Sequence, residues 1–492
     1  MVYTMNTESL SLLTDLYQLT MAAGYFKGGI GERRAAFQLF FRKRPFGGGY
    51  AIAAGLDDVL RWLEGLRFDA SDVEYLRTLT GADGKALFDP LFLSYLSAMR
   101  FSCDVHAIPE GTAVFEHEPL LRVEGPLIQA QLVETALLNM INFQTLIATK
   151  AARVCEAARG EPVLEFGLRR AQGIDGSLSA SRAAYIGGVA ATSNVLAGKR
   201  YGIPVKGTHA HSWVMAHKDE RTAFAEYAKA MPNNCVFLVD TYDTLEGVRN
   251  AIEVGKELRA GGHKLLGIRL DSGDLAYLSI EARKLLDAAG FEATQIVASN
   301  DLDEMLIENL KQQGATINVW GVGTKLVTAY DQPALGGVYK LAAIQDERGK
   351  WQHKVKISEQ AVKTSNPGRL QVRRYSNDAR FVADAIFDVD HAPKAGTTIV
   401  DPVDVTKRTV LADDLHFEDL LVPVMTNGQR VGKAPPLADV RAKARAQLDR
   451  LHPTIRRFLN PHVYPVGLDA RLFEEKVRLV QEARRPTLKR VS

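Results

Sequence analysis

Apolar and polar positions alternate in a regular rhythm between about residue 160 and residue 335. Six short runs rich in β-branched and apolar residues each precede a stretch with the spacing of an amphipathic helix. The runs are mostly apolar, as expected for strands that are covered on both faces. The expected strand and helix ranges, in chain order, are 162–169 and 177–200, 203–211 and 219–231, 234–240 and 244–260, 264–271 and 275–290, 294–300 and 302–314, and 317–323 and 324–330.

This order predicts parallel strands joined by helices, either in an open doubly wound sheet or in a barrel. In both architectures the chemistry lies beyond the carboxyl ends of the strands. Polar, charged or glycine-rich residues follow six consecutive runs, which favours one shared mouth. We therefore expect an α/β barrel with fewer than the usual eight strands, either open or completed from elsewhere in the chain.

The flanking regions have different patterns. Residues 1–130 mix helical and strand-like stretches, residues 338–425 are rich in strand signals, and residues 426–492 are helical and charged. We expect an N-terminal α/β domain over 1–130, completed by 338–425, around a barrel over 131–337. The remaining 426–492 is expected to be a C-terminal helical extension.

Composition narrows the class of protein. The 492 residues are 46% hydrophobic and 24% charged, with a net charge of +3. So small a charge argues against non-specific binding to nucleic acids or membrane surfaces, but it permits a local basic pocket. Three widely spaced cysteines indicate a reducing compartment. The polar N-terminus and the lack of an apolar run of about 18 residues predict a cytoplasmic protein with no membrane partner.

The segment "WGVGTKL" joins a strand, a Gly-x-Gly turn and a helix start around Gly321, Gly323 and Thr324. Such a turn directs backbone N–H groups toward a phosphate, although many glycine-rich turns only tighten a corner. In barrels, phosphate groups often bind at the last two strand-to-helix loops. The preceding loop carries Ser299 and Asn300, so a phosphate site is expected here.

Charged residues follow two neighbouring strands, with Asp240 and Asp243 after one and Arg269, Asp271 and Asp274 after the next. A solvated loop of mixed charge is the alternative. Carboxylates that share a mouth repel one another unless a cation is present, and Mg²⁺ commonly takes a few protein oxygens together with substrate phosphates. Arg269 suits a pair of anionic oxygens. These residues predict a Mg²⁺-bound phosphate substrate.

Two further groups leave alternatives open. Phe166 with Arg169 and Arg170 suits a flat anionic ring, but Phe166 is equally compatible with a place in the core. His209 and His211 lie two residues apart where a strand ends, without the ligand spacing of a zinc site. An imidazole there is compatible with a base or with a nucleophile toward phosphorus.

Seven motifs in this order resemble the nicotinate phosphoribosyltransferase family in its longer bacterial form. They are "TDLYQLTMAAGYF", "FFRKRPFGGGYAIAAGL", "EFGLRRAQGIDG", "GTHAHSWVM", "LVDTYDT", "IRLDSGDL" and "GVGTKL". The resemblance implies a type II phosphoribosyltransferase barrel packed on a discontinuous α/β domain, in a homodimer. It implies formation of nicotinate mononucleotide and pyrophosphate from nicotinate and phosphoribosyl pyrophosphate, with Mg²⁺ as cofactor and ATP as co-substrate.

The resemblance also assigns roles residue by residue. His211 matches the histidine that ATP phosphorylates, and Tyr17 matches a tyrosine that reaches across the dimer to the nicotinate ring. The other implied contacts are Phe166, Arg169 and Thr208 to nicotinate, Arg269, Ser299, Gly321, Gly323 and Thr324 to phosphoribosyl pyrophosphate, Asp271 at the ribose and metal-diphosphate, and Asp240 at the metal, directly or through water.

Two positions bear on specificity. Ser193, which is uncharged, matches a place where a nicotinamide-using relative carries an aspartate, and this suits an anionic substrate. "NPGRLQV" has Arg369 and Leu370 where the family pattern leads us to expect a lysine. Contacts of Arg42, Lys43, Arg44, Lys363 or Arg369 to pyrophosphate or ATP therefore stay open. The alternatives are nicotinamide or quinolinate as the substrate, or a phosphate-binding barrel isomerase or aldolase.

Overall fold

The computed structural model describes residues 9–360 and 363–484, and these form two compact units. Unit 1 comprises the described residues within 1–145, 334–436 and 446–492, and unit 2 comprises 146–333 and 437–445. The units change at 145, 333 and 436, close to the predicted domain boundaries at 130, 337 and 425, which stay a prediction. Residues 485–492 of the expected extension lie outside the described part of the chain.

Unit 2 contains one sheet in which every hydrogen-bonded pair of strands is parallel. Its spatial order is β7 (Ala191–Thr192), β6 (Val163–Glu165), β11 (Val319–Val322), β10 (Gln295–Ala298), β9 (Gly267–Leu270) and β8 (Val236–Leu238). A single parallel bridge from Thr192 to Val205 continues the order beyond β7. The strands therefore follow one another around a ring, and the pairing of β11 with β6 joins its last strand to its first. The expected α/β barrel is confirmed.

The ring has one gap, between the bridging segment at Val205 and β8. There the imidazole of His209 replaces a strand contact, because its Nε2 accepts a hydrogen bond from the backbone N–H of Leu238 at 3.2 Å. The barrel is thus closed by a side chain where the backbone ladder stops.

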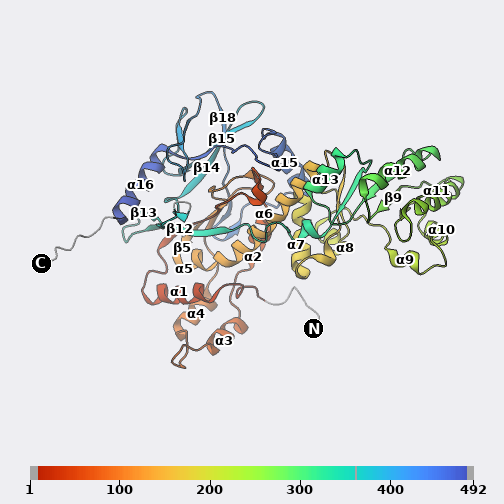
Figure 1. Cartoon of the computed structure of the whole chain (residues 1–492). Coiled ribbons are helices and arrows are strands. Elements are labelled where there is room, and N and C mark those ends of the chain that lie inside the picture. The colour runs from red at the N-terminus through yellow and green to blue at the C-terminus, as the bar shows by residue number, and fades with distance from the viewer. Residues whose placement is uncertain (1–8, 361–362, 485–492) are drawn as a thin grey trace. The chain divides into compact units, whose positions relative to one another are not determined.

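Helices follow the barrel strands in the chain, and α11 and α12 lie beside β9 in Figure 1. They are α7 (Gly173–Ile186), α8 (Val195–Tyr201), α9 (His211–Met215), α10 (Glu220–Ala230), α11 (Thr244–Ala260), α12 (Leu275–Ala288), α13 (Glu304–Gln312) and α14 (Thr324–Val327). Asp243, Asp274 and Asp303 each cap one of these helices by accepting a hydrogen bond from a backbone N–H near its start.

One expected helix is wrong. The range 177–200 is divided into α7, the strand β7 and α8. The break follows from Gly187, where a Cβ would lie 2.2 Å from the carbonyl oxygen of Ala148, and from Gly188, whose φ is +121°. The chain turns at this pair of glycines and β7 then pairs with β6. The expected strand 203–211 is also reduced to the bridge at Val205.

Unit 1 is built on two larger sheets. The first has the order β13 (Trp351–His353), β12 (Gly337–Gln345), β1 (Arg34–Phe41), β5 (Leu121–Pro126), β3 (Asp104–Ala107), β19 (Val422–Thr426) and β20 (Gln429–Arg430). The second has the order β17 (Arg408–Val410), β16 (Thr398–Val400), β21 (Val466–Asp469), β15 (Phe381–Asp388), β14 (Leu370–Ser376) and β18 (His416–Asp419). The strands β2 (Ala51–Ile52) and β4 (Ala113–Val114) form a small third sheet.

Helices complete unit 1 and connect it to unit 2 along the chain. They are α1 (Leu16–Lys27), α2 (Leu56–Gly65), α3 (Ala70–Thr78), α4 (Pro90–Ala98), α5 (Leu127–Leu132) and α16 (Ala470–Arg484), while α6 (Glu134–Ala157) and α15 (Leu437–Asp449) each contribute to both units. The segment 426–492 is therefore not only helical, because β20 and β21 belong to the sheets of unit 1. In the described residues no helix is long and apolar enough to cross a membrane.

Candidate active site

The carboxyl ends of the barrel strands bring together a network centred on Arg269, which lies in β9. Its guanidinium donates three hydrogen bonds: Nε to Ser299 Oγ at 2.7 Å, Nη1 to Thr208 Oγ1 at 3.0 Å and Nη2 to Asp271 Oδ1 at 2.9 Å. The three partners follow three different segments of the barrel. Because all three nitrogens are engaged, the guanidinium plane is held in one orientation.

Asp271 is held from two sides. Its Oδ1 accepts hydrogen bonds from Arg269 and Ser299, and its Oδ2 faces His211 Nε2 at 3.8 Å. Burial raises the pKa of this carboxyl, but the hydrogen bond from Ser299 and the charge and hydrogen bond of Arg269 outweigh burial, so the pKa lies below its ordinary value. Asp271 is therefore an anion at neutral pH.

Asp240 follows β8 and lies behind Asp271. Its Oδ2 accepts a hydrogen bond from the backbone N–H of Asp271 at 3.0 Å and another from Ser272 Oγ at 2.6 Å. Its Oδ1 is buried and has no hydrogen-bond partner among the described residues. A buried carboxylate oxygen without a donor is costly unless a cation or a ligand binds it.

Phe166 lies at the end of β6, where its backbone N–H donates to Val322 O at 2.9 Å. Its ring lies against Gly321 on β11, since a Cβ at Gly321 would approach the ring carbons to 2.8 Å. The Arg269 guanidinium carbon lies 5.6 Å from the ring centroid. Phe166 thus presents an aromatic face beside a cation at the mouth of the barrel.

The two histidines of the "THAHS" segment have opposite environments. His209 is buried, packs against Phe224, Tyr227 and Phe237, and has its pKa lowered to about 4 by burial. His211 begins α9, has a side chain that is 40% exposed, and places Nδ1 at 3.1 Å from Thr241 Oγ1. His209 therefore closes the barrel, whereas His211 is available at the mouth.

Comparison with known proteins finds one family along most of the chain. Models of the nicotinate phosphoribosyltransferase N-terminal domain, family and C-terminal domain match residues 12–142, 162–385 and 369–476. The nicotinate phosphoribosyltransferase of Bacillus subtilis is 46% identical over 489 residues, which cover 98% of this chain and 97% of the relative. The chain belongs to the nicotinate phosphoribosyltransferase family.

Relatives in animals extend the similarity to a solved structure. The human nicotinate phosphoribosyltransferase is 37% identical over 519 residues, covering 94% of this chain and 95% of its own. The crystal structure of human nicotinic acid phosphoribosyltransferase superposes with a TM-score of 0.83 at 35% identity, over 95% of this chain and 99% of that chain. The resemblance noted in the sequence is therefore confirmed as membership of the family.

The structure brings some of the expected site residues together and leaves others apart. Thr208, Asp240, Arg269, Asp271 and Ser299 form the hydrogen-bonded network, His211 faces it across 3.8 Å to Asp271, and Phe166 and Gly321 form its aromatic edge. Arg169 is exposed on the 3-10 turn Leu168–Arg170, and Ser193 follows β7, where its backbone N–H donates to Glu165 O at 2.9 Å. Gly323 and Thr324 lie at the start of α14. Tyr17 belongs to unit 1, on α1.

Two residues of this family member that the motifs did not single out support the site. Thr241 contacts His211, as described above. Glu165 is fully buried and accepts hydrogen bonds from Ser181 Oγ at 2.8 Å, from Thr192 Oγ1 at 2.6 Å and from the backbone N–H of Gly167. This carboxylate holds the turn directly after Phe166. An acidic residue inside an otherwise apolar strand is the signal that points to it in the sequence.

The acidic residues at the mouth fit a metal that is shared with a substrate. Among the described residues no group of three or more histidine, cysteine or acidic side chains is arranged to hold a metal ion by itself. Asp240 Oδ1, which lacks a donor, and Asp271 Oδ2 nevertheless offer hard oxygen atoms at one mouth. Mg²⁺ bound by one or two carboxylates and completed by phosphate oxygens suits this set.

Proposed function

We propose that this protein is an ATP-assisted nicotinate phosphoribosyltransferase that catalyses the first step of nicotinate salvage to NAD. The nicotinate ring nitrogen forms a bond to the anomeric carbon of phosphoribosyl pyrophosphate, and the bond from that carbon to the pyrophosphate oxygen breaks. The observation that carries the proposal is the Arg269 network, in a chain that belongs to this family throughout. Its guanidinium is fixed by Thr208, Asp271 and Ser299 beside the ring of Phe166.

The nicotinate ring is assigned to Phe166. A flat pyridine ring stacks on the exposed face of Phe166, and its carboxylate is compatible with the Thr208 hydroxyl and the Arg169 guanidinium. Ser193 adds no negative charge near an anionic substrate. Arg269, which lies on the same side of the barrel, strengthens the preference for an anion over the neutral nicotinamide.

The phosphoribosyl pyrophosphate is assigned to the neighbouring loops. Arg269 and Asp271 are placed for the ribose and the diphosphate, and Ser299, Gly321, Gly323 and Thr324 are assigned to the 5′-phosphate by family motif. Asp240 and Asp271 would hold Mg²⁺, which supplies positive charge to the departing pyrophosphate. The protein contributes a fixed cation, Arg269, in addition.

His211 is proposed as the nucleophile toward ATP. With Nδ1 donating its proton to Thr241 Oγ1, Nε2 keeps its lone pair at the open mouth. Nε2 forms a bond to the γ-phosphorus while the bond to the β–γ bridging oxygen breaks and ADP leaves. The carboxylate of Asp271, 3.8 Å from Nε2, stabilises the positive charge that the ring gains as Nε2 bonds to phosphorus.

We propose a cytoplasmic homodimer in which Tyr17 of one chain completes the nicotinate site of the other. The supporting observation is that Tyr17 is 48% exposed within unit 1, next to the exposed side chains of Leu13, Leu16 and Met21. Exposed apolar side chains in one short segment support an interface with a second chain. All three cysteines are free, which agrees with a reducing compartment.

The test is the formation of pyridine nucleotide from phosphoribosyl pyrophosphate and Mg²⁺ with nicotinate, nicotinamide or quinolinate, each with and without ATP. We expect turnover on nicotinate that ATP increases, and little on the other two. Turnover restricted to nicotinamide or quinolinate would replace the substrate assignment. The isomerase or aldolase alternative is set aside by the family membership.

A further inference from the structure

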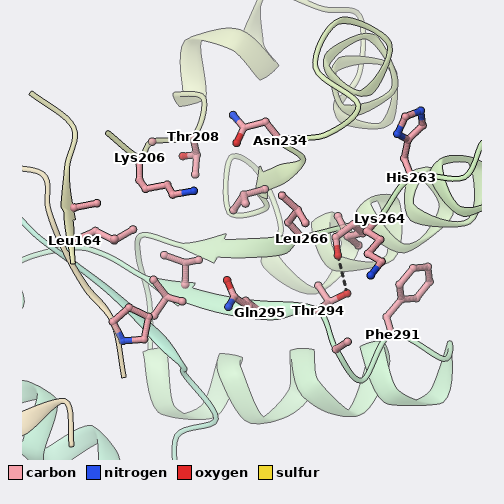
Figure 2. Close-up of a pocket in the computed structure, with 18 of the residues that line it drawn as sticks. Leu164, Lys206, Thr208, Asn234, His263, Lys264, Leu266, Phe291, Thr294 and Gln295 are labelled. Carbon is pink, nitrogen blue, oxygen red and sulfur yellow. Dashed lines mark hydrogen bonds between the residues drawn. The ribbon is translucent and has the colours of Figure 1, made fainter. Parts of the chain in front are cut away.

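The barrel of unit 2 is hollow. A cavity of about 850 Å³ runs from Phe166 and Thr208, at the carboxyl ends of the strands, to the loops that precede β9 and β10 at their amino ends. Figure 2 shows Leu164, Lys206 and Thr208 at one end of this cavity and His263, Lys264 and Phe291 at the other. A pocket of this volume is large enough for a drug-sized ligand, well beyond one pyridine ring.

The sequence explains why this barrel is not filled. Paired residues of parallel strands point to the same side, so three sets of paired residues face the lumen: Ala191, Leu164 and Gly321; Val236, Gly267 and Gln295; and Leu238, Arg269, Val297 and Val319. Barrel interiors are usually packed with bulky branched side chains. Here glycine or alanine stands in two of the three sets. In contrast, Phe237, Ile268, Ile296 and Trp320, on the helix-facing side, are completely buried.

The segment around Val205, which forms only a single bridge where a barrel strand was expected, adds a cation to the lumen. Val205 faces outward, because one of its methyl groups would lie 2.3 Å from a Cβ at Gly198 of α8. Lys206, the next residue, therefore points inward and lines the cavity. Its ammonium forms no hydrogen bond or ion pair within residues 9–360 and 363–484. Figure 2 shows this ammonium directed into the cavity between Leu164 and Asn234.

The opening of the cavity at the amino ends of the strands is positively charged, like Lys206. Arg259, His263 and Lys264 lie around it, and Glu292 is the acidic residue among the lining groups. Between the two ends the wall is mostly apolar, with Leu164, Val236, Leu266, Val297 and Val319, and its polar residues are Asn234, Thr294 and Gln295. Of these, Leu266 is 37% exposed.

We propose that the barrel lumen is a second ligand site, which binds an amphiphilic anion entering from the amino end of the strands. The apolar body of the ligand lies along Leu164, Val297 and Val319, and its anionic group pairs with Lys206. Since Phe166 and Thr208 line both the lumen and the assigned nicotinate site, the ligand excludes nicotinate. This exclusion rests on the proposed function, whereas the binding itself does not.

The probe is 8-anilinonaphthalene-1-sulfonate, an aromatic sulfonate whose fluorescence rises in apolar surroundings, titrated into the full-length protein. We expect saturable binding that nicotinate displaces. Gln295→Trp places an indole in the lumen, and Lys206→Met removes the cation, so each is expected to weaken binding about tenfold. The matched controls Gln312→Trp and Lys199→Met alter exposed residues outside the lumen and are expected to leave binding unchanged.

Probe binding that is the same in wild type, Gln295→Trp and Lys206→Met overturns the lumen site. Because Lys206→Met removes no packed side chain, its result stands even if Gln295→Trp does not fold. Binding that depends on both residues, but is not displaced by nicotinate in an enzyme that uses nicotinate, overturns the exclusion. If instead nicotinate is not a substrate while binding still depends on Lys206 and Gln295, the proposed function fails and the lumen site stands.

Discussion

At the carboxyl end of the barrel strands Arg269 donates three hydrogen bonds to side chains, whereas at the amino end Lys264 makes no hydrogen bond or ion pair with any described residue. Both ends are basic and both open onto the same lumen. One end is held rigid by polar contacts, as a site that stabilises charge in a transition state must be. At the other end Arg259 donates a hydrogen bond to Gly290 O at 2.6 Å, but Lys264 supplies charge without a fixed geometry.

The largest expected effect comes from replacing Arg269 at the carboxyl end. Arg269→Lys keeps the charge but cannot reach Thr208, Asp271 and Ser299 together, so we expect kcat/KM for phosphoribosyl pyrophosphate to fall about 100- to 1000-fold. Arg259→Lys at the amino end is the matched control, and its kcat/KM should stay within about twofold of wild type. Equal losses in the two variants would remove the distinction between the ends. Steady-state kinetics of both variants measure this difference in kcat/KM.

The next effect concerns the aromatic edge of the carboxyl end. Gly321→Ala places a Cβ 2.8 Å from the ring carbons of Phe166, so the ring must move. We expect kcat/KM for nicotinate to fall about 10- to 100-fold, because small misplacements at a reacting site are costly. Gly176→Ala, in α7 where a Cβ meets nothing within 4 Å, is the control. Unchanged kinetics for Gly321→Ala would show that nicotinate does not use Phe166.

A smaller effect tests the buried oxygen of Asp240. Asp240→Asn removes the negative charge at Oδ1, so the Mg²⁺ concentration for half-maximal activity should rise about tenfold. Asp243→Asn, three residues on, keeps its capping hydrogen bond to the backbone N–H of Glu246 and serves as the control. The Mg²⁺ dependence of pyrophosphate release is the measurement. An equal shift in both variants would mean that general electrostatics, not a metal contact, is responsible.

The smallest expected effect is the pH dependence that His209 adds to the free energy of unfolding. The pKa of His209 is lowered to about 4 by burial, so the unfolded chain binds a proton that the folded barrel does not accept. Stability is therefore complete above the ordinary pKa of about 6.5 and falls as the pH falls toward 4. Between pH 6.5 and 5.5 this group should cost about 1 kcal/mol of the free energy of unfolding.

Chemical denaturation at the two pH values measures this loss. His209→Gln should be less stable than wild type at both values, because the contact to Leu238 is weakened. The difference in its stability between pH 6.5 and 5.5 should be smaller than that of wild type by about 1 kcal/mol. A difference equal to that of wild type would mean that His209 does not titrate as described.

The carboxyl end could be predicted from the sequence, and the amino end could not. Arg269, Asp271 and Asp240 each follow an apolar run, and parallel strands place such residues at one rim. The lumen depends instead on which residues pair, and the strand β7 was hidden inside an apparent helix that breaks at Gly187 and Gly188. The sequence alone does not show which glycine and alanine residues face the lumen.

The different positions of His209 and His211 also could not be predicted from the sequence. Two residues apart at the end of the expected strand 203–211, their side chains would lie on one face of that strand. The segment leaves the ladder after Val205, so His209 turns toward Leu238 and the aromatic side chains of α10, while His211 starts a helix at the mouth. Burial distinguishes the two rings, and burial at a strand end is not encoded in local spacing.

The most direct test of the active mouth is transfer of the γ-phosphate of ATP to the protein. We predict an acid-labile label on the peptide that contains His211, present in wild type and in His209→Gln and absent in His211→Asn. His211→Asn should also lose the stimulation of nicotinate turnover by ATP. A label that persists in His211→Asn, or that disappears in His209→Gln while that variant remains folded, would contradict the assignment of the nucleophile.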